Sequence, residues 1–305
     1  MTCPLHHDCA PRLVRVLDPA AIAHRWMSEY AIEVDNSLLN LREVNHWRCE
    51  LSGFEWYDPP EAAGGARLYE QLAKYPWYYM PDKWEFAASL KYLARGSNVL
   101  EVGSGSGTFL QVARSSGIQI AGVELNPSAA QHSRDMGFRV TEDDIRSLAV
   151  HESQRYDAVC AFQVLEHVTD PVSFLADMLR LVRIGGIIVL AVPNDDFMSV
   201  IDSDHRNLLN QPPHHMSHWS RTAIDSFTSV LPMKLVACRR EPLQLHHISW
   251  FVNGFSGYVR NRFGGVVGGC VANRITRTMA ATLCRIGFRH MIPGHTLLAV
   301  LVRMK

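Results

Sequence analysis

Three glycines at alternate positions follow a short apolar run that carries a carboxylate. The stretch reads VLEVGSGSG and contains Glu101, followed by Gly103, Gly105 and Gly107. Glycine at such a turn lets the backbone approach a ligand closely and adopt dihedral angles that other residues resist. Glu124 stands 21 residues after Gly103, where a carboxylate can accept both hydroxyls of a ribose. These residues predict a site for a ribose-bearing cofactor.

The spacing of the glycines argues against a nicotinamide dinucleotide. The dinucleotide fingerprint G-x-G-x-x-G would place its third glycine at position 108, which is occupied by Thr108. In this chain the third glycine is Gly107, one residue early. A cradle for a pyrophosphate is therefore not required.

The elements that must position this loop follow from the alternation of apolar runs and helical periods between Asn98 and Asn194, which predicts βαβ units. We expect seven strands, at 98–102, 118–124, 138–140, 156–162, 187–192, 233–239 and 295–303. We expect helices at 108–115, 128–136 after Pro127, 171–182 and about 221–231, the last capped by Ser220. The predicted fold is α/β, with a Rossmann-like, doubly wound, mostly parallel seven-stranded sheet. Residues 1–97 read as aromatic and irregular.

The glycine pattern and its acid resemble the E-x-G-x-G-x-G motif of class I S-adenosylmethionine-dependent methyltransferases. The similarity continues, in the same order along the chain, through 143–145 (DDI), 163–168 (QVLEHV) and 183–186 (RIGG). It covers most of residues 75–240 and the terminal strand. The resemblance implies S-adenosylmethionine as the cofactor and methyl transfer as the reaction.

The resemblance also implies which residues hold the polar parts of this cofactor. The glycine loop would support the methionine part, and Glu101 would help to hold its amino group. Glu124 would take the ribose hydroxyls, with Leu125 beside it as a further contact. The alternative for Leu125 is an ordinary core position.

The adenine and the reactive end are assigned in the same way. Asp144 would accept a hydrogen bond from the adenine amino group while the backbone N–H of Ile145 meets the ring. Phe162 and Gln163, at the exit of the fourth strand, would line the methionine end. Asp144 could instead be an ordinary helix N-cap.

The V-L-E-H-V sequence is similar to the subgroup of ubiquinone-biosynthesis O-methyltransferases and their relatives in sugar and natural-product pathways. Gln163 stands where the ubiquinone-type pattern has a glutamate, so the divalent-metal role proposed for that pattern is not expected here. Glu166 and His167 remain at the carboxyl edge of the sheet. A histidine can remove the proton of a hydroxyl at neutral pH, which makes His167 a candidate general base. The alternative is that His167 packs at the strand exit.

A second histidine cluster follows the fifth strand. Residues 211–220 (QPPHHMSHWS) resemble a segment of methyltransferases from bacterial surface-polysaccharide and secondary-metabolite gene neighbourhoods. His214 and His215 are candidates for the base or for substrate hydrogen bonds. Alternatively, they hold the loop to the sheet through backbone hydrogen bonds. Four residues before the sheet resemble the segment that lies over the cofactor in this family: Tyr78, Tyr79, Lys83 and Trp84. The alternative is that they pack in the core.

Cysteine and histidine near the N-terminus resemble the knuckles of a zinc ribbon. The first knuckle would be 3–6, with His7 and Cys9 nearby, and the second 49–52, where Ser52 replaces the fourth ligand. A structural zinc ion needs four nitrogen or sulfur ligands. His46 could supply the missing one, but we expect a degenerate knuckle without bound metal.

The net charge of zero hides a strong asymmetry. Residues 1–204 contain 17 lysines and arginines against 28 acids, a net charge of −11. Residues 205–305 contain 13 against 2, a net charge of +11, and no acid follows Glu241. Either the C-terminal part faces something anionic, or it docks on the acidic part of the chain. The arginines between the last two strands are Arg260, Arg262, Arg274, Arg277, Arg285 and Arg289.

We expect three parts: an N-terminal extension (1–75), a methyltransferase domain (76–245 and 293–305) and a basic insertion (246–292) that caps the substrate. No apolar run of 18 residues is free of charge, and no secretory signal layout is visible at the N-terminus. Seven scattered cysteines are typical of reduced thiols. We expect a cytoplasmic protein. Peripheral contact with the inner membrane surface through residues 251–291 is a further possibility.

The leading hypothesis is methyl transfer to a hydroxyl of a sugar or another small metabolite. This acceptor could carry a phosphate or be lipid-linked, which would make it anionic. An NAD-dependent oxidoreductase or epimerase is disfavoured by the missing glycine. A nucleic-acid-binding or RNA-modifying protein is disfavoured by a pI near 7.3 and the lack of an aromatic RNA-binding motif, so no nucleic-acid partner is expected. A catalytically silent membrane-surface protein conflicts with the intact cofactor motifs. The acceptor atom and the oligomeric state stay open.

Overall fold

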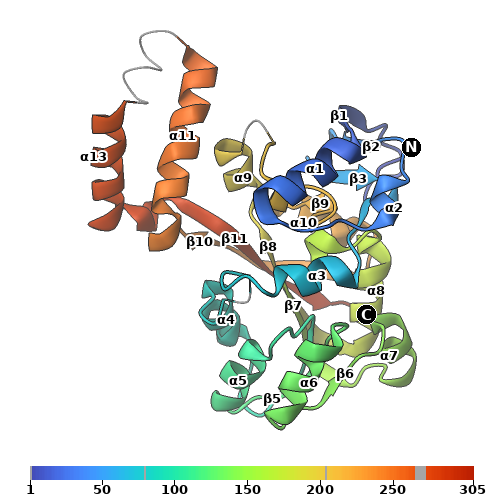
Figure 1. Cartoon of the computed structure of the whole chain (residues 1–305). Helices are drawn as coiled ribbons and strands as arrows, with labels where there is room; N and C mark the ends of the chain where they lie inside the picture. The colour runs from blue at the N-terminus through green and yellow to red at the C-terminus, as the bar shows by residue number, and fades with distance from the viewer. Residues whose placement is uncertain (1, 79, 203–204, 265–272) are drawn as a thin grey trace.

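Seven strands form the central sheet of the computed structural model, which describes residues 2–78, 80–202, 205–264 and 273–305 (Figure 1). Their spatial order is β10-β11-β8-β7-β4-β5-β6. Strands β4 to β8 run parallel, and β11 is antiparallel to both of its neighbours. This confirms the predicted mostly parallel sheet. The strands are β4 (Asn98–Val102), β5 (Gln119–Val123), β6 (Val140–Thr141), β7 (Tyr156–Phe162), β8 (Val182–Pro193), β10 (Met233–Pro242) and β11 (Pro293–Arg303).

Helices cover both faces of this sheet. One face packs on α7 (Ile145–His151), α8 (Pro171–Leu181) and α10 (Arg221–Asp225), and the other on α4 (Trp84–Ser89) and α5 (Thr108–Ser115), with α6 (Pro127–Asp135) beside β6. Val99 of β4 enters the core that contains Phe109, whereas its neighbour Leu100 enters the core that contains Leu175. Because both faces are buried, these strands read as continuous apolar runs in the sequence.

Local capping residues set the ends of two predicted helices. The Asn126 side chain accepts the N–H groups of Ser128 and Ala129 at the start of α6. Ser220 accepts the N–H of Ala223 and caps α10, as predicted. The helix predicted to about 231 ends earlier, because α10 stops at Asp225 and continues as a 3-10 turn. The 3-10 helices are Pro60–Ala62, Leu90–Tyr92, Leu165–His167, Leu208–Asn210, Ser226–Ser229, Leu245–His247 and Phe288–Met291.

The N-terminal region is ordered into a second sheet, so its interpretation as irregular was wrong. Its strands are β1 (Arg12–Leu17), β2 (Val44–Arg48), β3 (Glu55–Asp58) and β9 (Ser217–His218), in that spatial order and all antiparallel. Helices α1 (Pro19–Tyr30), α2 (Asn36–Leu39) and α3 (Ala66–Leu72) pack on it around the buried Trp26. The sheet is completed by β9, which lies far along the chain and after the central strands, so local patterns could not reveal it.

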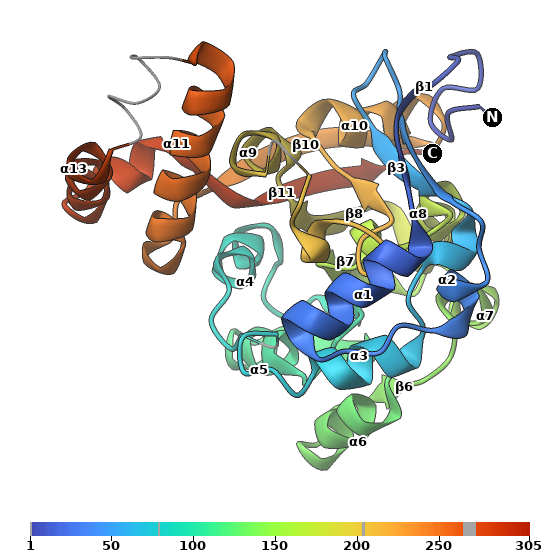
Figure 2. The same cartoon turned by 45° about the horizontal axis from the view of Figure 1, so that its top comes forward.

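Among the described residues, two α-helices lie between β10 and β11 in the sequence and form a hairpin. Its members are α11 (Ile248–Phe263) and α13 (Arg274–Arg285), and α11 also packs on α9 (Asp195–Ile201). The hairpin stands away from the central sheet in Figure 1 and Figure 2. Gly264 ends α11 with a φ of 57°, as expected for a helix-breaking glycine, while Gly265, Gly268 and Gly269 lie outside the described residues. In the described part of the chain, no helix has the length and apolar character needed to cross a bilayer.

Candidate active site

A cavity of about 1630 Å³ opens at the carboxyl ends of the parallel strands, where open α/β sheets bind ligands. The segments that follow β4, β5, β6 and β7 form one part of its wall. The loop after β8 and aromatic side chains from the N-terminal region form the rest. Every predicted site residue lines this cavity except Gly107. The sequence motifs therefore converge on one place.

The glycine loop has the backbone that its sequence predicts. Gly103 has a φ of 72°, and a Cβ there would lie 2.5 Å from Cγ2 of Val164. Gly107 has a φ of 78° and is the N-cap of α5, where a Cβ would lie 2.6 Å from Oγ of Ser133. Both positions combine a left-handed backbone with a close neighbour, so only glycine fits. The role of Gly107 is to shape the loop from outside the cavity.

Glu124 is held at the cavity wall by two backbone hydrogen bonds. Its Oε2 accepts the N–H of Gly105 at 2.7 Å, and its Oε1 accepts the N–H of Asn126 at 2.8 Å. These bonds fix the carboxylate and join it to the glycine loop, while each oxygen keeps a lone pair for a ligand hydroxyl. Leu125 beside it is 67% exposed and lines the cavity, so its interpretation as an ordinary core residue was wrong.

Glu101 brings an unsatisfied acceptor to the cavity. Its side chain is buried, and its Oε2 accepts no hydrogen bond within the described residues. Burial raises the pKa of this carboxyl well above its usual range. A buried acceptor without a partner is costly unless a ligand supplies a donor. The site therefore fits a ligand that carries an amino group, as S-adenosylmethionine does.

Asp144 and Ile145 lie side by side at the cavity wall after β6. The Asp144 side chain accepts the N–H of Arg146 at 3.3 Å and caps α7, so the N-cap interpretation is confirmed. This bond uses one carboxyl oxygen of Asp144, and the contact of Asp144 with adenine stays a prediction.

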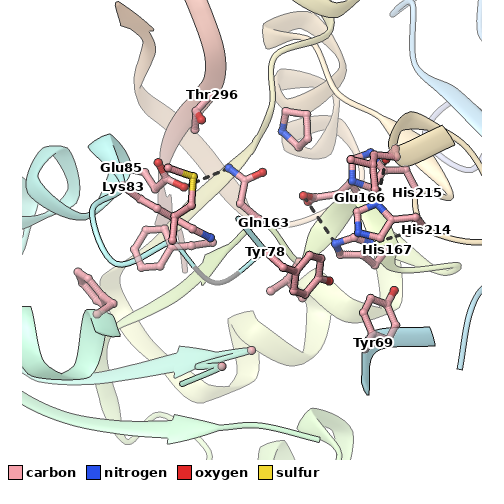
Figure 3. Close-up of a pocket in the computed structure, with 18 of the residues that line it drawn as sticks. Tyr69, Tyr78, Lys83, Glu85, Gln163, Glu166, His167, His214, His215 and Thr296 are labelled. Atoms are coloured by element: carbon pink, nitrogen blue, oxygen red, sulfur yellow. Dashed lines mark hydrogen bonds and ion pairs between the residues drawn. The ribbon is translucent and has the colours of Figure 1, made fainter. Parts of the chain in front are cut away.

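Phe162 ends β7, Gln163 follows it, and both line the cavity. The Phe162 ring packs against Phe109, with the ring centroids 4.6 Å apart. Gln163 has a φ of 56°, and its Nε2 donates to Oε1 of Glu85 at 3.2 Å (Figure 3). A left-handed backbone at a non-glycine residue is typical of functional sites. Glu85 thus holds the Gln163 side chain, a role that the sequence did not indicate.

Three histidines gather beside Glu166, on the side of the cavity away from Lys83 and Glu85 (Figure 3). The ring centroid of His167 lies 4.7 Å from that of His214 and 4.9 Å from that of His215. The centroids of His214 and His215 are 4.5 Å apart. One ring nitrogen of each lies within 4.8 Å of one ring nitrogen of the other two. The two sequence segments that supplied base candidates therefore form a single cluster, which could also hold a metal ion.

Hydrogen bonds define which nitrogen of each histidine can accept a proton. The Nδ1–H of His167 donates to the carbonyl of His214 at 2.5 Å, and that of His214 donates to the carbonyl of Leu209 at 2.8 Å. Nδ1 of His215 lies 3.3 Å from the side-chain oxygen of Asn210. Carbonyl oxygens accept only, so the Nε2 atoms carry the lone pairs. Nε2 of His214 is buried and has no partner among the residues that the structure describes.

Burial sets the charge of this cluster. It lowers the pKa of His167 to about 4 and that of His214 to about 3, with backbone hydrogen bonds acting in the opposite direction. It also raises the pKa of Glu166 to about 8, and Oε1 of Glu166 lies 3.9 Å from Nε2 of His167. At neutral pH the imidazoles are unprotonated and the carboxyl is protonated. The arrangement can accept a proton from a hydroxyl placed beside it.

Other residues of the cavity were not found from the sequence. Tyr69 presents its ring edge-on to His167, with the centroids 5.5 Å apart. Glu241 accepts the N–H of Thr296 at 3.1 Å, and burial raises its pKa to about 7. The position of Glu241 as the last acid of the chain was the one available signal. Of the expected cover segment, Tyr78, Lys83 and Trp84 line the cavity and Tyr79 lies outside the described residues.

The N-terminal knuckle does not form in the way that the sequence suggested. Ser52 lies two residues before Phe54 and accepts its N–H at 3.3 Å. Nε2 of His46 lies 2.8 Å from Oε2 of Glu55, and its ring stacks on Tyr57. Neither side chain completes a set of thiol ligands. The other predicted ligands, Cys3, His6 and Cys49, do meet there.

Comparisons with known proteins agree with these motifs. The family model described as "Methyltransferase domain" matches residues 72–228, about half of the chain. The ubiquinone biosynthesis O-methyltransferase of Proteus mirabilis (strain HI4320) is 31% identical over 128 residues, which cover 39% of this chain and 51% of that protein. The same-named protein of Alkalilimnicola ehrlichii (strain ATCC BAA-1101 / DSM 17681 / MLHE-1) is 28% identical over 166 residues, 52% of this chain and 63% of that protein. The chain thus spans about half to two thirds of these relatives.

Among solved structures, a SAM dependent methyltransferase from Archaeoglobus fulgidus has a TM-score of 0.48 and 15% identity, covering 72% of this chain and 92% of that one. The match to the methyltransferase domain model spans the glycine loop, the V-L-E-H-V segment and both halves of the histidine cluster. The chain therefore belongs to the methyltransferase domain family, the S-adenosylmethionine-dependent group that its motifs resemble.

Proposed function

We propose that this protein methylates a hydroxyl of a small molecule, a sugar or a related metabolite, with S-adenosylmethionine as the cofactor. The observation that carries the proposal is that the glycine loop with Glu124 and the three-histidine cluster line the same cavity. S-adenosylmethionine, when bound, supplies a sulfonium methyl group that a nucleophile can attack. Glu101, Glu124 and Asp144 would hold the cofactor.

The histidine cluster would prepare the acceptor. Nε2 of His167 takes the proton of the acceptor hydroxyl, while its Nδ1–H bond to the His214 carbonyl keeps the ring in place. Above its pKa of about 8 Glu166 is ionised, and its carboxylate, 3.9 Å away, would stabilise the imidazolium that forms. Aromatic side chains from the N-terminal region exclude water from this end of the cavity. The ones that line it are Tyr30, Tyr69, Trp77 and Tyr78.

The lining favours an acceptor whose buried part is uncharged. Within the described residues, the wall contains one lysine, Lys83, and no arginine. Aromatic walls with a few polar groups suit a ring such as that of a sugar. A phosphate or lipid-linked group on the acceptor would therefore extend out of the cavity, toward the hairpin of α11 and α13.

The direct test is turnover with a panel of hydroxylated acceptors. The protein, incubated with S-adenosylmethionine and free or nucleotide-linked sugars, should form S-adenosylhomocysteine only with acceptors that carry a free hydroxyl. O-methylated versions of the same acceptors serve as controls. Thermal stabilisation by NAD but not by S-adenosylmethionine would contradict the proposal and favour an oxidoreductase.

The charge of Glu166 predicts how turnover depends on pH. His167 stays unprotonated above a pKa of about 4, so acid should not reduce kcat until the pH falls near that value. Glu166 is protonated below a pKa of about 8, so kcat should rise as the pH increases through that value and the carboxylate forms. The Glu166→Gln variant should lose this alkaline rise and keep the acid limb. A variant that retains the rise would exclude Glu166 as its source.

We further infer that the hairpin of α11 and α13 contacts an anionic membrane surface. Arg277 donates to Asn253 and Arg289 to a backbone carbonyl, and no ion pair with the acidic part of the chain involves the hairpin arginines in the described ranges. This argues against internal docking. Apolar side chains are nevertheless exposed on the hairpin and just after it: Phe263, Ile275, Met279, Ile286, Phe288 and Met291 are 53–81% exposed. Exposed apolar and basic side chains together are typical of helices that lie at a bilayer surface.

Sedimentation with vesicles tests this inference. The wild-type protein should bind vesicles that contain anionic lipid, and binding should fall as the salt concentration rises. Arg274→Glu with Arg285→Glu should weaken it roughly tenfold or more, and Ile275→Ser with Met279→Ser should weaken binding at every salt concentration. Val150, 70% exposed on α7, provides the control Val150→Ser. Equal binding by all variants would contradict the inference.

A further inference from the structure

Four side chains with nitrogen or sulfur donors meet where the N-terminus touches the turn after β2. Sγ of Cys49 lies 3.4 Å from Nδ1 of His6 and 3.7 Å from Sγ of Cys9. Sγ of Cys3 lies 3.9 Å from the same nitrogen of His6. One donor atom from each of Cys3, His6 and Cys49 lies within 4.8 Å of the other two. Three of the four donors therefore surround a common point, and Sγ of Cys9 adjoins them through its contact with Cys49.

These separations are those of ligands around one tetrahedral metal ion. Zinc–sulfur bonds of about 2.3 Å and zinc–nitrogen bonds of about 2.05 Å place two sulfurs about 3.8 Å apart and a sulfur and nitrogen about 3.5 Å apart. The observed pairs fall at 3.7 Å and at 3.4 and 3.9 Å. A disulfide would need its sulfurs about 2.05 Å apart. Cys3, Cys9 and Cys49 are free thiols.

The backbone turns both ligand segments toward this point. The N–H of His6 donates to the carbonyl of Cys3 at 3.3 Å, and that of Cys9 to the carbonyl of His6 at 2.9 Å. On the other side, the N–H of Gly53 donates to the carbonyl of Cys49 at 2.9 Å, with a φ of 70° at Gly53. Each segment forms a tight turn that presents its ligands on one side.

The surroundings favour a closed site over a reactive one. Cys3 and Cys49 are 0% exposed and lie in an apolar core with Leu5, Phe54 and Trp56. Two buried thiols beside an imidazole gain little from one another, because thiols are weak hydrogen-bond donors. A metal ion would satisfy all of them at once, and four protein ligands would leave no position for a substrate.

We propose that Cys3, His6, Cys9 and Cys49 bind a structural zinc ion in a tetrahedral Cys₃His site. Sulfur and nitrogen ligands in this geometry select zinc over calcium or magnesium. The site differs from the metal-free N-terminus expected from the sequence. It keeps Cys3, His6 and Cys49 of the two predicted knuckles, and Cys9 takes the place of the fourth ligand, for which 52 and 46 were considered.

The zinc ion would act on the active site through the N-terminal sheet. It joins the first residues to the turn between β2 and β3, and β3 pairs with β9. The N–H of Tyr57 in β3 donates to the carbonyl of Met216 at 2.9 Å, next to His215. The metal therefore braces the strand that holds the histidine loop, and its role is to position that loop.

Metal analysis of the untagged full-length protein tests the proposal. Protein purified from zinc-supplemented medium under reducing conditions should contain about one zinc ion per chain. Cys49→Ser and Cys9→Ser should lose it. His7→Ala changes an exposed neighbour of the ligands, and Cys238→Ser a remote thiol, so both should keep the zinc and act as matched controls.

A second measurement needs no variant and holds even if the serine variants do not fold. Exchange of the metal for cobalt in the wild-type protein should give the absorption bands of a tetrahedral cobalt–thiolate complex, which histidine-only binding cannot produce. Three results would each overturn the proposal. They are substoichiometric zinc, zinc retained by Cys49→Ser, and a Cys9–Cys49 disulfide found by mass spectrometry of protein freshly purified from a lysate kept under reducing conditions.

Discussion

Replacing His167 is expected to lower kcat roughly 10²–10⁴-fold while the affinity for S-adenosylmethionine stays unchanged. The Nε2 lone pair of His167 faces the cavity, because its Nδ1–H is committed to the carbonyl of His214. His167→Asn is the sharpest variant, since its amide N–H can still donate to that carbonyl but offers no base. Steady-state kinetics and calorimetry with S-adenosylhomocysteine measure the two effects separately.

Related variants decide which histidine is the base. His214→Ala and His215→Ala should cost less than His167→Asn if their role is to hold the loop, and His132→Ala, on the exposed surface of α6, serves as the control. Activity of His167→Asn should recover as the pH approaches the pKa of the acceptor hydroxyl itself. If all three cluster variants stay fully active, catalysis depends on positioning alone. If a chelator abolishes wild-type activity while the zinc at Cys3, His6, Cys9 and Cys49 stays bound, and a divalent ion restores the activity, the cluster is a metal site.

The parts of the site that could be predicted are those encoded by short segments. The glycine loop, Glu124 and Asp144 each follow a buried strand, and the carboxyl ends of parallel strands meet at one edge of a sheet. The alternation of apolar runs and helical periods placed these segments at one edge, and the resemblance to methyltransferases supplied their roles. His167 and His214 also follow strands of that sheet, and the motifs that contain them marked them as candidates.

The parts that could not be predicted depend on partners far apart in the sequence. Strand β9 pairs with β3, so Glu55 lies opposite His218 across 163 residues. No hydrophobic periodicity in the sequence predicts such a pair, because a two-residue strand is too short to show an alternation of apolar and polar residues. At the N-terminus the resemblance to zinc knuckles brought Cys9 near Cys49 in the sequence, but it did not show that Cys9 rather than Ser52 or His46 contacts Cys49. In the sequence, Glu85 could not be told from any other acidic residue in the first turn of a helix, so its contact with Gln163 could not be predicted.

Replacing Glu124 by alanine is expected to weaken binding of S-adenosylmethionine by about 1–3 kcal/mol, because the ribose hydroxyls would lose a charged acceptor. The structure adds a second contribution, since the same carboxylate accepts the N–H groups of Gly105 and Asn126. The alanine variant therefore also loosens the glycine loop. Calorimetry with the cofactor and with S-adenosylhomocysteine measures the sum of both losses.

Glu124→Gln separates the two contributions. Its amide oxygen can replace one carboxylate oxygen toward the backbone, but it lacks the charge and the second acceptor for the ribose. An intermediate loss would show that both contributions act, whereas a loss equal to that of alanine would assign the effect to the ribose. Glu142→Ala, at the end of the neighbouring strand β6 and outside the cavity wall, is the matched control. If Glu124→Ala binds the cofactor as tightly as this control, Glu124 does not hold the ribose, and its role is confined to bracing the loop.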